Sequence, residues 1–262
     1  MMSKFKSFVL EIYIAYAQAK AKGMIIRKSS FLGEVWILAE PAVMAIVFTV
    51  LYSLKVIPIE NLGMSFGFFI VTGFLVWQLF NDSLIDGIEL LNYNKVFANS
   101  VTISNYSILL ALIIFRLKFI FYHTFIMLIL CFSYYGYFDI LQIIPFLISI
   151  AIITLLGLGI GLCISPFAWF LGDLNKGLRL TLRPLMFVSG VVFPMGATSF
   201  SQYAESNPIN ILIDWSRIPF ADTANMLIDV SAGLHFSLFI SISFFVIGIY
   251  ITNRTLRYVY SQ

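Results

Sequence analysis

Long apolar blocks are the feature of this chain that most constrains its fold. Stretches such as 66–80, 140–170 and 233–252 contain few or no charged side chains. An apolar segment of about 18 residues or more is typical of a helix that crosses a bilayer. Hydrophobic residues make up 60% of the sequence and charged residues 11%, well below the roughly 25% charged residues of soluble domains. The blocks therefore predict an all-α integral membrane protein.

The blocks predict six transmembrane helices. Six spans of about 20 residues each, together with the connections between them, leave no length for a separate soluble domain. We therefore expect a six-span transmembrane domain at 31–262, preceded by a helix at 1–30. The expected spans are Val35–Leu54, Phe66 to about Ile85, Ile108 to about Phe132, Ile140–Phe170, Pro184–Pro194 and Gly233–Thr252.

Two of the blocks differ in length from an ordinary span. The fourth would be about 46 Å long as a helix, so we expect it to tilt, to protrude from the bilayer, or to bend where helix-weakening residues occur, at Gly157, Gly159, Gly161 and Pro166. The fifth, counted from Pro184 through the break at Pro194 to Gly196, reaches only about 20 Å as a helix, whereas the hydrocarbon core is about 30 Å thick. We therefore expect the chain to turn back inside the bilayer after the fifth span.

Helix signals follow the break at Pro194. Asn207 is a suitable N-cap, Pro208 suits the first helical position, and Pro219 would end the helix. Its apolar face would hold Ile209, Leu212 and Ile213. A second short helix is expected at Asp222–Val230, closed by Gly233. We expect short re-entrant helices between spans five and six, built around Pro194, Asn207, Pro208, Trp215 and Arg217; ordinary periplasmic loops with an interfacial helix are the alternative.

Residues 1–30 predict a cytoplasmic amphipathic helix that lies in the membrane interface. Apolar residues recur at helical spacing, at Phe5, Phe8, Val9, Ile12, Tyr13 and Tyr16. The opposite face would hold Lys4, Ser7, Glu11, Gln18 and Lys22. A signal peptide is the alternative, because lysines precede a short apolar stretch and Ala15–Ala17 resembles a cleavage site. Glu11 interrupts that stretch, which favours the uncleaved helix.

The basic residues predict the orientation of the chain. With six spans, the two termini share one face with two of the connecting loops, and most of the basic residues fall there. Those residues are Lys4, Lys6, Lys20, Lys22, Arg27, Lys28, Lys95, Lys176, Arg179, Arg183, Arg254 and Arg257, whereas the other face holds Lys55 and Arg217. Cytoplasmic loops are enriched in lysine and arginine. We therefore expect a bacterial inner-membrane protein with both termini in the cytoplasm.

The sequence lacks the parts of an enzyme active site. His123 and His235 both lie inside expected spans, without a nearby pair of carboxylates. Cys131 and Cys163 lie inside apolar runs, so neither a disulfide nor a metal site is predicted. The chain also contains no G-x-x-x-x-G-K-[ST] phosphate-binding loop. We expect a transport subunit that holds no cofactor and hydrolyses no ATP itself.

Several segments together resemble the membrane subunit of type-2 ABC exporters for capsular polysaccharide, the KpsM-like permeases. Besides the N-terminal amphipathic helix, they are RKSSFLGEVWILAEPAV at Arg27–Val43, VTISNYSILLALIIFRL at Val101–Leu117, RPLMFVSGVVFP at Arg183–Pro194 and NPINILIDWSR at Asn207–Arg217. The resemblance covers nearly the whole chain and rests on the order and spacing of these segments.

The resemblance implies a homodimer that encloses one conduit, with two copies of a cytoplasmic ABC ATPase beneath it that bind ATP and Mg²⁺. Its substrate would be an acidic polysaccharide linked to a lipid, passed on to periplasmic and outer-membrane export components. No nucleic-acid partner is expected. The segment from Gly87 to Ser100 would be a coupling helix seated in the ATPase, with a solvated loop as the alternative. Its contact residues would be Asn92, Tyr93, Asn94, Lys95, Val96 and Phe97.

An acidic substrate would need cations at the cytoplasmic entrance and aromatic faces for its sugar rings. The candidate cations are Arg27, Lys28, Arg116, Lys118, Arg179 and Arg183, and the candidate rings include Trp36 and Trp77. Arg116 and Lys118 carry the most weight, because a charge within a span is costly unless it faces a cavity or a partner. Snorkelling, the positive-inside bias and aromatic belts are the alternatives for these residues.

Two other functions fit the same sequence. Exporters of O-antigen, teichoic acid or a small hydrophobic molecule share this architecture. A proton-coupled carrier is less favoured, because such carriers hold acidic residues near the middle of the membrane. The acidic residues in or beside the first two expected spans fall near cytoplasmic ends, at Glu34, Glu40, Asp82 and Asp86.

Overall fold

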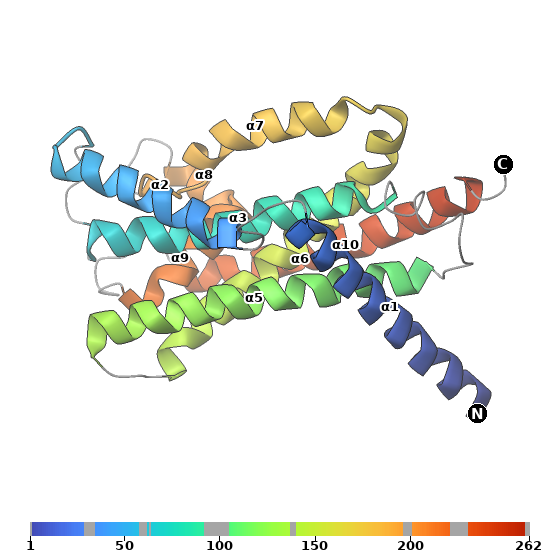
Figure 1. The fold of residues 1–262 in the computed structure, drawn as a ribbon. Coiled ribbons are helices and arrows are strands. Elements are labelled where there is room, and N and C mark those ends of the chain that lie inside the picture. Colours follow the sequence, from blue (N-terminus) through green and yellow to red (C-terminus); the bar gives the residue numbers. More distant parts are fainter. Residues whose placement is uncertain are drawn as a thin grey trace.

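The computed structural model describes residues 2–28, 35–57, 62, 64–91, 105–136, 140–195, 201–220 and 230–259. Every regular element in these ranges is a helix, which confirms the all-α prediction (Figure 1). The elements are α1 Met2–Lys28, α2 Val35–Ser53, α3 Phe66–Ile88, α5 Asn105–Tyr135, α6 Ile140–Phe170, α7 Leu174–Val188, α8 Ser201–Ser206, α9 Pro208–Arg217, the 3-10 helix η2 Ile218–Phe220 and α10 Val230–Val259.

Four helices of the described chain are long and apolar enough to cross a membrane. They are α3, α5, α6 and α10. Within α2 the apolar stretch Pro41–Ser53 is shorter than these, and α7 has only 15 residues. The structure therefore supports a membrane protein built on four long apolar helices, whereas six spans remain a prediction.

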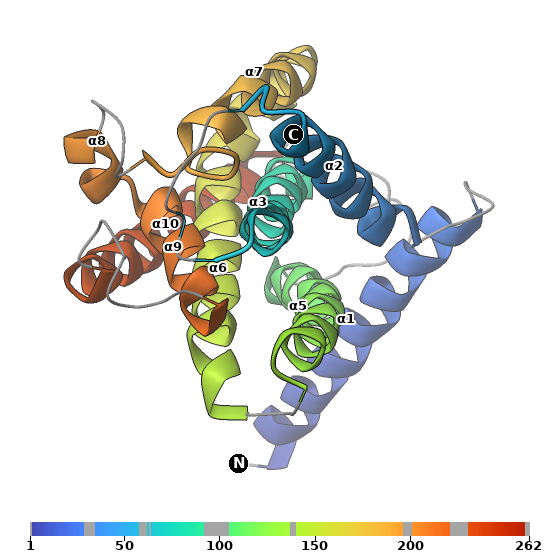
Figure 2. The same ribbon diagram turned by 90° about the vertical axis from the view of Figure 1, so that its left-hand side faces the viewer.

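Helix α6 packs most extensively against α3 and α10 (Figure 2). It is one continuous helix of 31 residues that includes Pro166, so the residues predicted to weaken it do not interrupt it. A Cβ on Gly157 would lie 2.6 Å from the Phe80 carbonyl oxygen of α3, and a Cβ on Gly159 would lie 2.6 Å from the Phe245 nitrogen of α10. The glycines instead let α6 approach two neighbouring helices closely.

The fifth apolar block does not form the helix that its length predicts. Helix α7 begins at Leu174, so Pro184 lies inside it, and it ends at Val188, before the predicted end at Pro194. Gly190 explains this early end, because its φ of +74° is a left-handed conformation that stops a helix. The half-buried Pro194 follows in the irregular segment that leads out of this turn.

The start of the last helix also differs from the prediction. Helix α10 begins at Val230, and Gly233 lies inside it rather than closing a preceding helix. A Cβ on Gly233 would lie 2.8 Å from the Ile211 side chain of α9, so this glycine allows close packing. The predicted helix at Asp222–Val230 falls outside the described residues, apart from Val230 itself.

Helix α1 crosses the outside of α5, and its start lies at the same end of the bundle as the end of α10 (Figures 1 and 2). Between residues 9 and 24 of α1, where side-chain burial is described, the buried residues are small, namely Ala15, Ala19 and Gly23. The predicted apolar face is exposed where the structure describes it, for example at Tyr13 and Tyr16. The predicted polar face is not simply solvated, because Lys22 pairs with Asp86 of α3.

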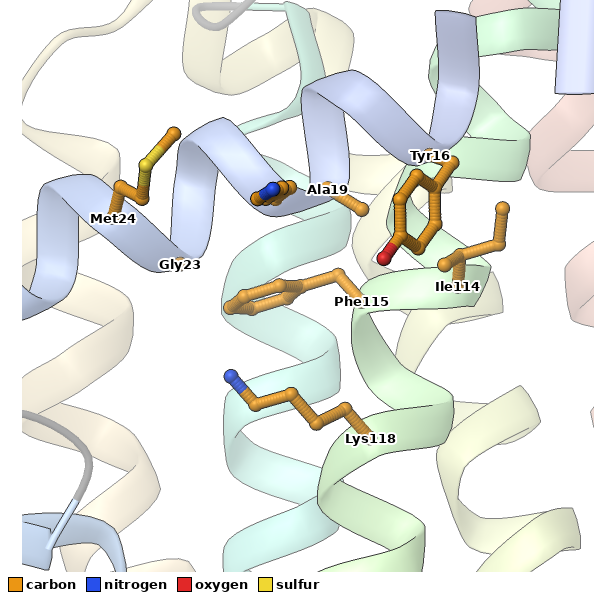
Figure 3. A pocket seen from close by; sticks show the side chains of 8 residues that line it. Tyr16, Ala19, Gly23, Met24, Ile114, Phe115 and Lys118 are labelled. Carbon is orange, nitrogen blue, oxygen red and sulfur yellow. The ribbon is translucent and has the colours of Figure 1, made fainter. Parts of the chain in front are cut away.

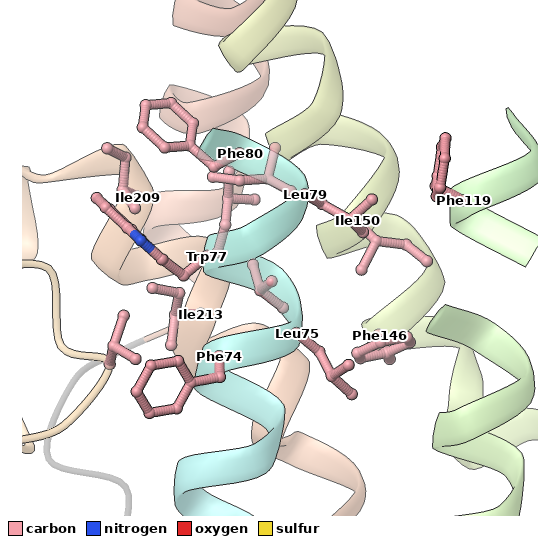
Figure 4. Packing of buried hydrophobic residues seen from close by; sticks show 14 of the residues in the cluster. Phe74, Leu75, Trp77, Leu79, Phe80, Phe119, Phe146, Ile150, Ile209 and Ile213 are labelled. Carbon is pink, nitrogen blue, oxygen red and sulfur yellow. The ribbon is translucent and has the colours of Figure 1, made fainter. Parts of the chain in front are cut away.

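The apolar core surrounds α3 (Figure 4). On one side, Leu75 lies toward Phe146 of α6. On another side, α9 brings the buried residues Ile209, Leu212 and Ile213, which confirms the predicted apolar face of that segment. A helix of ten residues is thus packed among α3, α6 and α10.

Candidate functional site

Four charged side chains meet where α1, α3 and α5 come together, and we call them the α1–α3–α5 charge cluster. They are Lys22, Asp82, Asp86 and Arg116. Arg116 Nε donates to Asp86 Oδ2 over 2.6 Å, and Arg116 Nη2 donates to the Asp82 carbonyl oxygen over 3.0 Å. Lys22 Nζ lies 2.7 Å from the other oxygen of the Asp86 carboxylate. The Asp86 carboxylate therefore joins the cations of α1 and α5 to α3.

The local sequence explains how the cluster forms. Asp82 and Asp86 are about one helical turn apart, so they lie on the same face of α3. The Arg116 guanidinium also lies over two rings of its own helix, at 5.7 Å from the Phe115 centroid and 5.2 Å from the Phe119 centroid. Only 6% of the Arg116 side chain and 9% of the Asp86 side chain are exposed. Ion pairs and ring faces thus compensate for the cost of burying these charges.

This geometry gives the predicted pathway cation Arg116 a clamping role between helices. The neighbouring Lys118 is half-buried on another face of α5, where its ammonium lies 5.3 Å from the Phe119 centroid and 5.7 Å from the Tyr122 centroid. The substrate-pathway role of both residues therefore remains a proposal, because no conduit is defined by the contacts of the described chain.

Among the described side chains, the other predicted cations lie away from α5. Arg179 and Arg183 are exposed on α7, which lies on the side of α3 away from α5 in Figure 2. Arg179 Nη2 lies 2.9 Å from Glu89 Oε1, beyond the end of α3. Arg27 and Lys28 occupy the end of α1, and their side chains fall outside the described part of the chain.

The two predicted aromatic candidates have different environments. Trp36 is exposed on α2. Trp77 is buried and points from α3 toward α9, beside Ile209 and Ile213 (Figure 4). Its ring centroid is 5.5 Å from that of Phe80. Trp77 is therefore a core residue of this bundle, whereas Trp36 is placed to face lipid or a partner.

The predicted ATPase-coupling residues fall in a stretch that the structure does not describe. This stretch is 92–104, and it includes Asn92, Tyr93, Asn94, Lys95, Val96 and Phe97. It follows the end of α3 and precedes the start of α5. Both of these helix ends lie at the same end of the bundle (Figure 1), and Asp86 of the charge cluster lies in the last turn of α3.

A second polar group, the α9 polar cluster, contains Arg217, Asp214 and Asn210. Arg217 is buried, and its Nη1 lies 2.9 Å from Asp214 Oδ1. Its Nη2 donates to the carbonyl oxygens of Phe69 at 3.1 Å and Val191 at 3.0 Å. Asn210 Nδ2 donates to Asp214 Oδ2 over 3.1 Å. The cluster therefore ties α9 to α3 and to the turn after α7.

The predicted start of α9 is confirmed. Asn207 is the N-cap, and its side chain accepts a hydrogen bond of 3.0 Å from the Ile209 nitrogen. Pro208 is the first residue of the helix, and η2 follows the helix with Pro219 at its centre. Trp215 is half-buried near the end of α9. The burial of Ile211 and Arg217 shows that α9 is enclosed on more than its apolar face.

Sequence reasoning missed the acidic partners of both clusters. From the sequence, the positions of Asp82 and Asp86 serve only as an argument against a proton-coupled carrier, and no role is predicted for Asp214. A usable signal existed, because a charge buried in an apolar bundle needs an opposite charge nearby. Asp214 precedes Arg217 by three residues, a spacing that brings side chains together on a helix.

His123 and the two cysteines do not form a third polar cluster in the described ranges. His123 is buried, and its Nδ1 lies 2.8 Å from the Phe119 carbonyl oxygen of the same helix. No group of three or more metal-ligating side chains occurs among the residues that the structure describes. Cys131 and Cys163 are free thiols.

We expect Arg116→Ala to destabilise the bundle. Asp86 would keep Lys22 but lose Arg116, and breaking a buried ion pair costs about 3 kcal/mol or more. The midpoint of thermal unfolding in detergent should fall clearly, whereas Arg183→Ala on the exposed face of α7 should leave it unchanged. Arg116→Met combined with Asp86→Asn should recover part of the loss. A single Arg116→Ala variant as stable as the parent chain would contradict the clamping role.

No protein-family model matches the sequence, and no curated protein is significantly similar to it.

Proposed function

We propose that this chain is the transmembrane subunit of an ATP-driven exporter that moves a lipid-linked, acidic polysaccharide across the bacterial inner membrane. The observation that carries the proposal is the interrupted segment after α6. Helix α7 ends early, the chain turns at Gly190, and α9 is buried among three long apolar helices. Non-helical backbone at membrane depth occurs where protein or a water-filled cavity covers it, and in transporters it often borders the substrate site.

The surface of α7 supports a homodimer as part of this proposal. Leu182 is the buried residue of α7, whereas the apolar side chains of Leu180, Leu185, Phe187 and Val188 are exposed. Figure 1 shows that α7 runs along the outside of the bundle. An exposed apolar helix face needs lipid or protein to cover it. A second copy of the chain seated there would enclose a conduit between the two subunits.

The energy source in this proposal is a separate ATPase. The sequence has no phosphate-binding loop, so ATP and Mg²⁺ would bind to the partner subunit. The buried acids that a proton-coupled carrier would use are also engaged with cations, at Asp86 by Lys22 and Arg116 and at Asp214 by Arg217. Both considerations favour ATP-driven export over the carrier.

Co-purification tests the division of labour between the two subunits. The chain, expressed with an ABC ATPase from the same genome, should retain that ATPase through affinity purification if the two are partners. Tyr93→Glu and Phe97→Glu should greatly reduce the retained amount, because a charge would be placed in an apolar contact. The matched control is Tyr203→Glu in α8, where the side chain is 73% exposed. Equal retention by all three variants would contradict the coupling segment.

Transport in liposomes separates the competing functions. The complex should move a lipid-linked anionic polymer only when ATP is supplied. Movement of a lipid-linked neutral polymer at the same rate would favour a sister exporter of the same architecture. Movement driven by an ion gradient, by the purified chain alone, would show that the chain is a carrier and would overturn the proposal.

A further inference from the structure

Helix α5 differs from the other three long apolar helices because it contains no residue that commonly bends a helix. Its 31 residues include neither glycine nor proline, whereas α3, α6 and α10 each contain at least one of the two. Sharp kinks in helices occur mostly at these residues. Helix α5 is therefore suited to move as one stiff body.

Arg116 fastens α5 to α3 within the α1–α3–α5 charge cluster. Its guanidinium donates to the Asp86 carboxylate and to the carbonyl oxygen of Asp82. Ile114 and Lys118 precede and follow Arg116 by two residues, so they lie on the opposite side of α5. A cavity of about 510 Å³ lies there between α5 and α1 (Figure 3). This part of α5 therefore has a polar anchor on one side and room to move on the other.

The far end of α5 is fastened to η2. The Tyr135 hydroxyl donates a hydrogen bond to the carbonyl oxygen of Pro219. The Tyr134 ring meets the Phe220 ring edge-on, with the two centroids 5.7 Å apart. Pro219 and Phe220 are buried, and η2 directly follows Arg217, the last residue of α9. The far end of α5 therefore holds the end of α9 in place.

Between these two anchors, α5 is buried along a single narrow stripe. Arg116 and Tyr135 are about 28 Å apart along the helix. The buried residues between them recur every four positions, at Phe119, His123, Met127 and Cys131. His123 Nδ1 bonds to a backbone carbonyl oxygen of α5 itself. Helices that touch along one such stripe can slide past each other by small shear motions.

We propose that α5 is a rigid link between the α1–α3–α5 charge cluster and α9. When the hold of Arg116 on α3 changes, α5 shifts along its buried stripe, and η2 moves with the far end of α5. The packing of α9 then responds to a site about 28 Å away. The link itself does not depend on the proposed function. In the proposed exporter, it would carry a displacement from the cytoplasmic side toward the outer side of the membrane.

The link can be measured on the purified full-length chain, without the ATPase or the polymer. The reporter is Ile211→Cys in a chain with Cys131→Ala and Cys163→Ala, labelled with a water-soluble maleimide, because the Ile211 side chain of α9 is 1% exposed. Arg116→Lys keeps the charge of the anchor but lacks the planar fork that contacts α3. It should raise the labelling rate about fivefold, which is the lower end of the coupling between distant sites.

A matched pair of variants tests whether α5 carries the effect. Phe125 lies between the two anchors and is 57% exposed. Phe125→Pro should kink α5, whereas Phe125→Ala removes the same ring and keeps the helix straight. The effect of Arg116→Lys on the labelling rate should persist with Phe125→Ala and disappear with Phe125→Pro. Tyr135→Phe removes the hydroxyl that contacts Pro219, so it should also abolish the effect, and it gives the same test where the proline variant does not fold.

Two outcomes would overturn the rigid link. An unchanged labelling rate in Arg116→Lys would show that the charge cluster does not act on α9. The same increase with Phe125→Ala, Phe125→Pro and Tyr135→Phe would show that a general loosening of the bundle exposes α9. Every variant that is compared must elute as a monodisperse, folded protein. Neither outcome depends on whether the chain exports a polysaccharide, so the link and the proposed function can fail separately.

Discussion

Replacing Gly161 with leucine is expected to prevent α3 and α6 from packing, so that little monodisperse protein is recovered from the membrane. A Cβ on Gly161 would lie 2.9 Å from the Gly87 Cα and 3.0 Å from the Ile88 nitrogen, which are both backbone atoms of α3. A side chain can be displaced by a rotamer change, but a helix backbone cannot move without separating the two helices. The measurement is size-exclusion chromatography of a fluorescent fusion, followed by thermal unfolding of whatever is recovered.

Alanine substitutions give this prediction its control. Gly177 lies in α7, and a Cβ there would meet no atom of another described element within 4 Å. Alanine favours a helix by about 1 kcal/mol over glycine, so Gly177→Ala should leave stability unchanged or raise it. Gly161→Ala should lower it, because overpacking costs about 1–3 kcal/mol. If both alanine variants were stabilised alike, the close contact of α3 and α6 would be wrong.

The glycines show why the helices could be predicted from sequence but their packing could not. The apolar blocks predict α3, α5, α6 and α10 because a helix in lipid must satisfy its own backbone hydrogen bonds. Glycine lowers helix propensity, and that local effect predicts a weak point in α6. Gly161 can either weaken its own helix or allow another helix to pack closely against it. Which of these effects it has depends on α3, which lies far away in the sequence. The residues around Gly161 carry no signal of that neighbour.

The candidate site shows the same limit. The cost of a buried charge makes Arg116 conspicuous in the sequence. Its compensation, however, is supplied by Asp86 and Asp82 on another helix. The start of α9 could be predicted because Asn207 acts on its own helix. The partners of Arg217 could not, since they include backbone carbonyl oxygens of α3 and of the turn after α7, which carry no side-chain signal.

Replacing Arg217 with methionine is expected to release α9 from the bundle. The change keeps the length of the side chain but leaves Asp214 without its counter-charge and leaves the Phe69 and Val191 carbonyl oxygens without this donor. Removing one partner of a buried ion pair costs about 3–5 kcal/mol. That is enough to open a helix of ten residues that is held by its packing and by this cluster.

Cysteine labelling measures this opening directly. In a chain with Cys131→Ala and Cys163→Ala, the thiol introduced by Ile211→Cys should resist a water-soluble maleimide, because the Ile211 side chain is 1% exposed. Adding Arg217→Met should make that thiol react rapidly, whereas Arg217→Lys should give an intermediate rate, because lysine keeps the charge but lacks the planar fork of donors.

A paired substitution distinguishes the ion pair from apolar packing as the cause of the protection. Adding Asp214→Leu to Arg217→Met should restore part of the protection, since neither member of the buried ion pair then remains. Slow labelling in every variant would show instead that apolar packing alone holds α9. In that case, the α9 polar cluster would not be what holds α9 against α3 and the turn at Gly190.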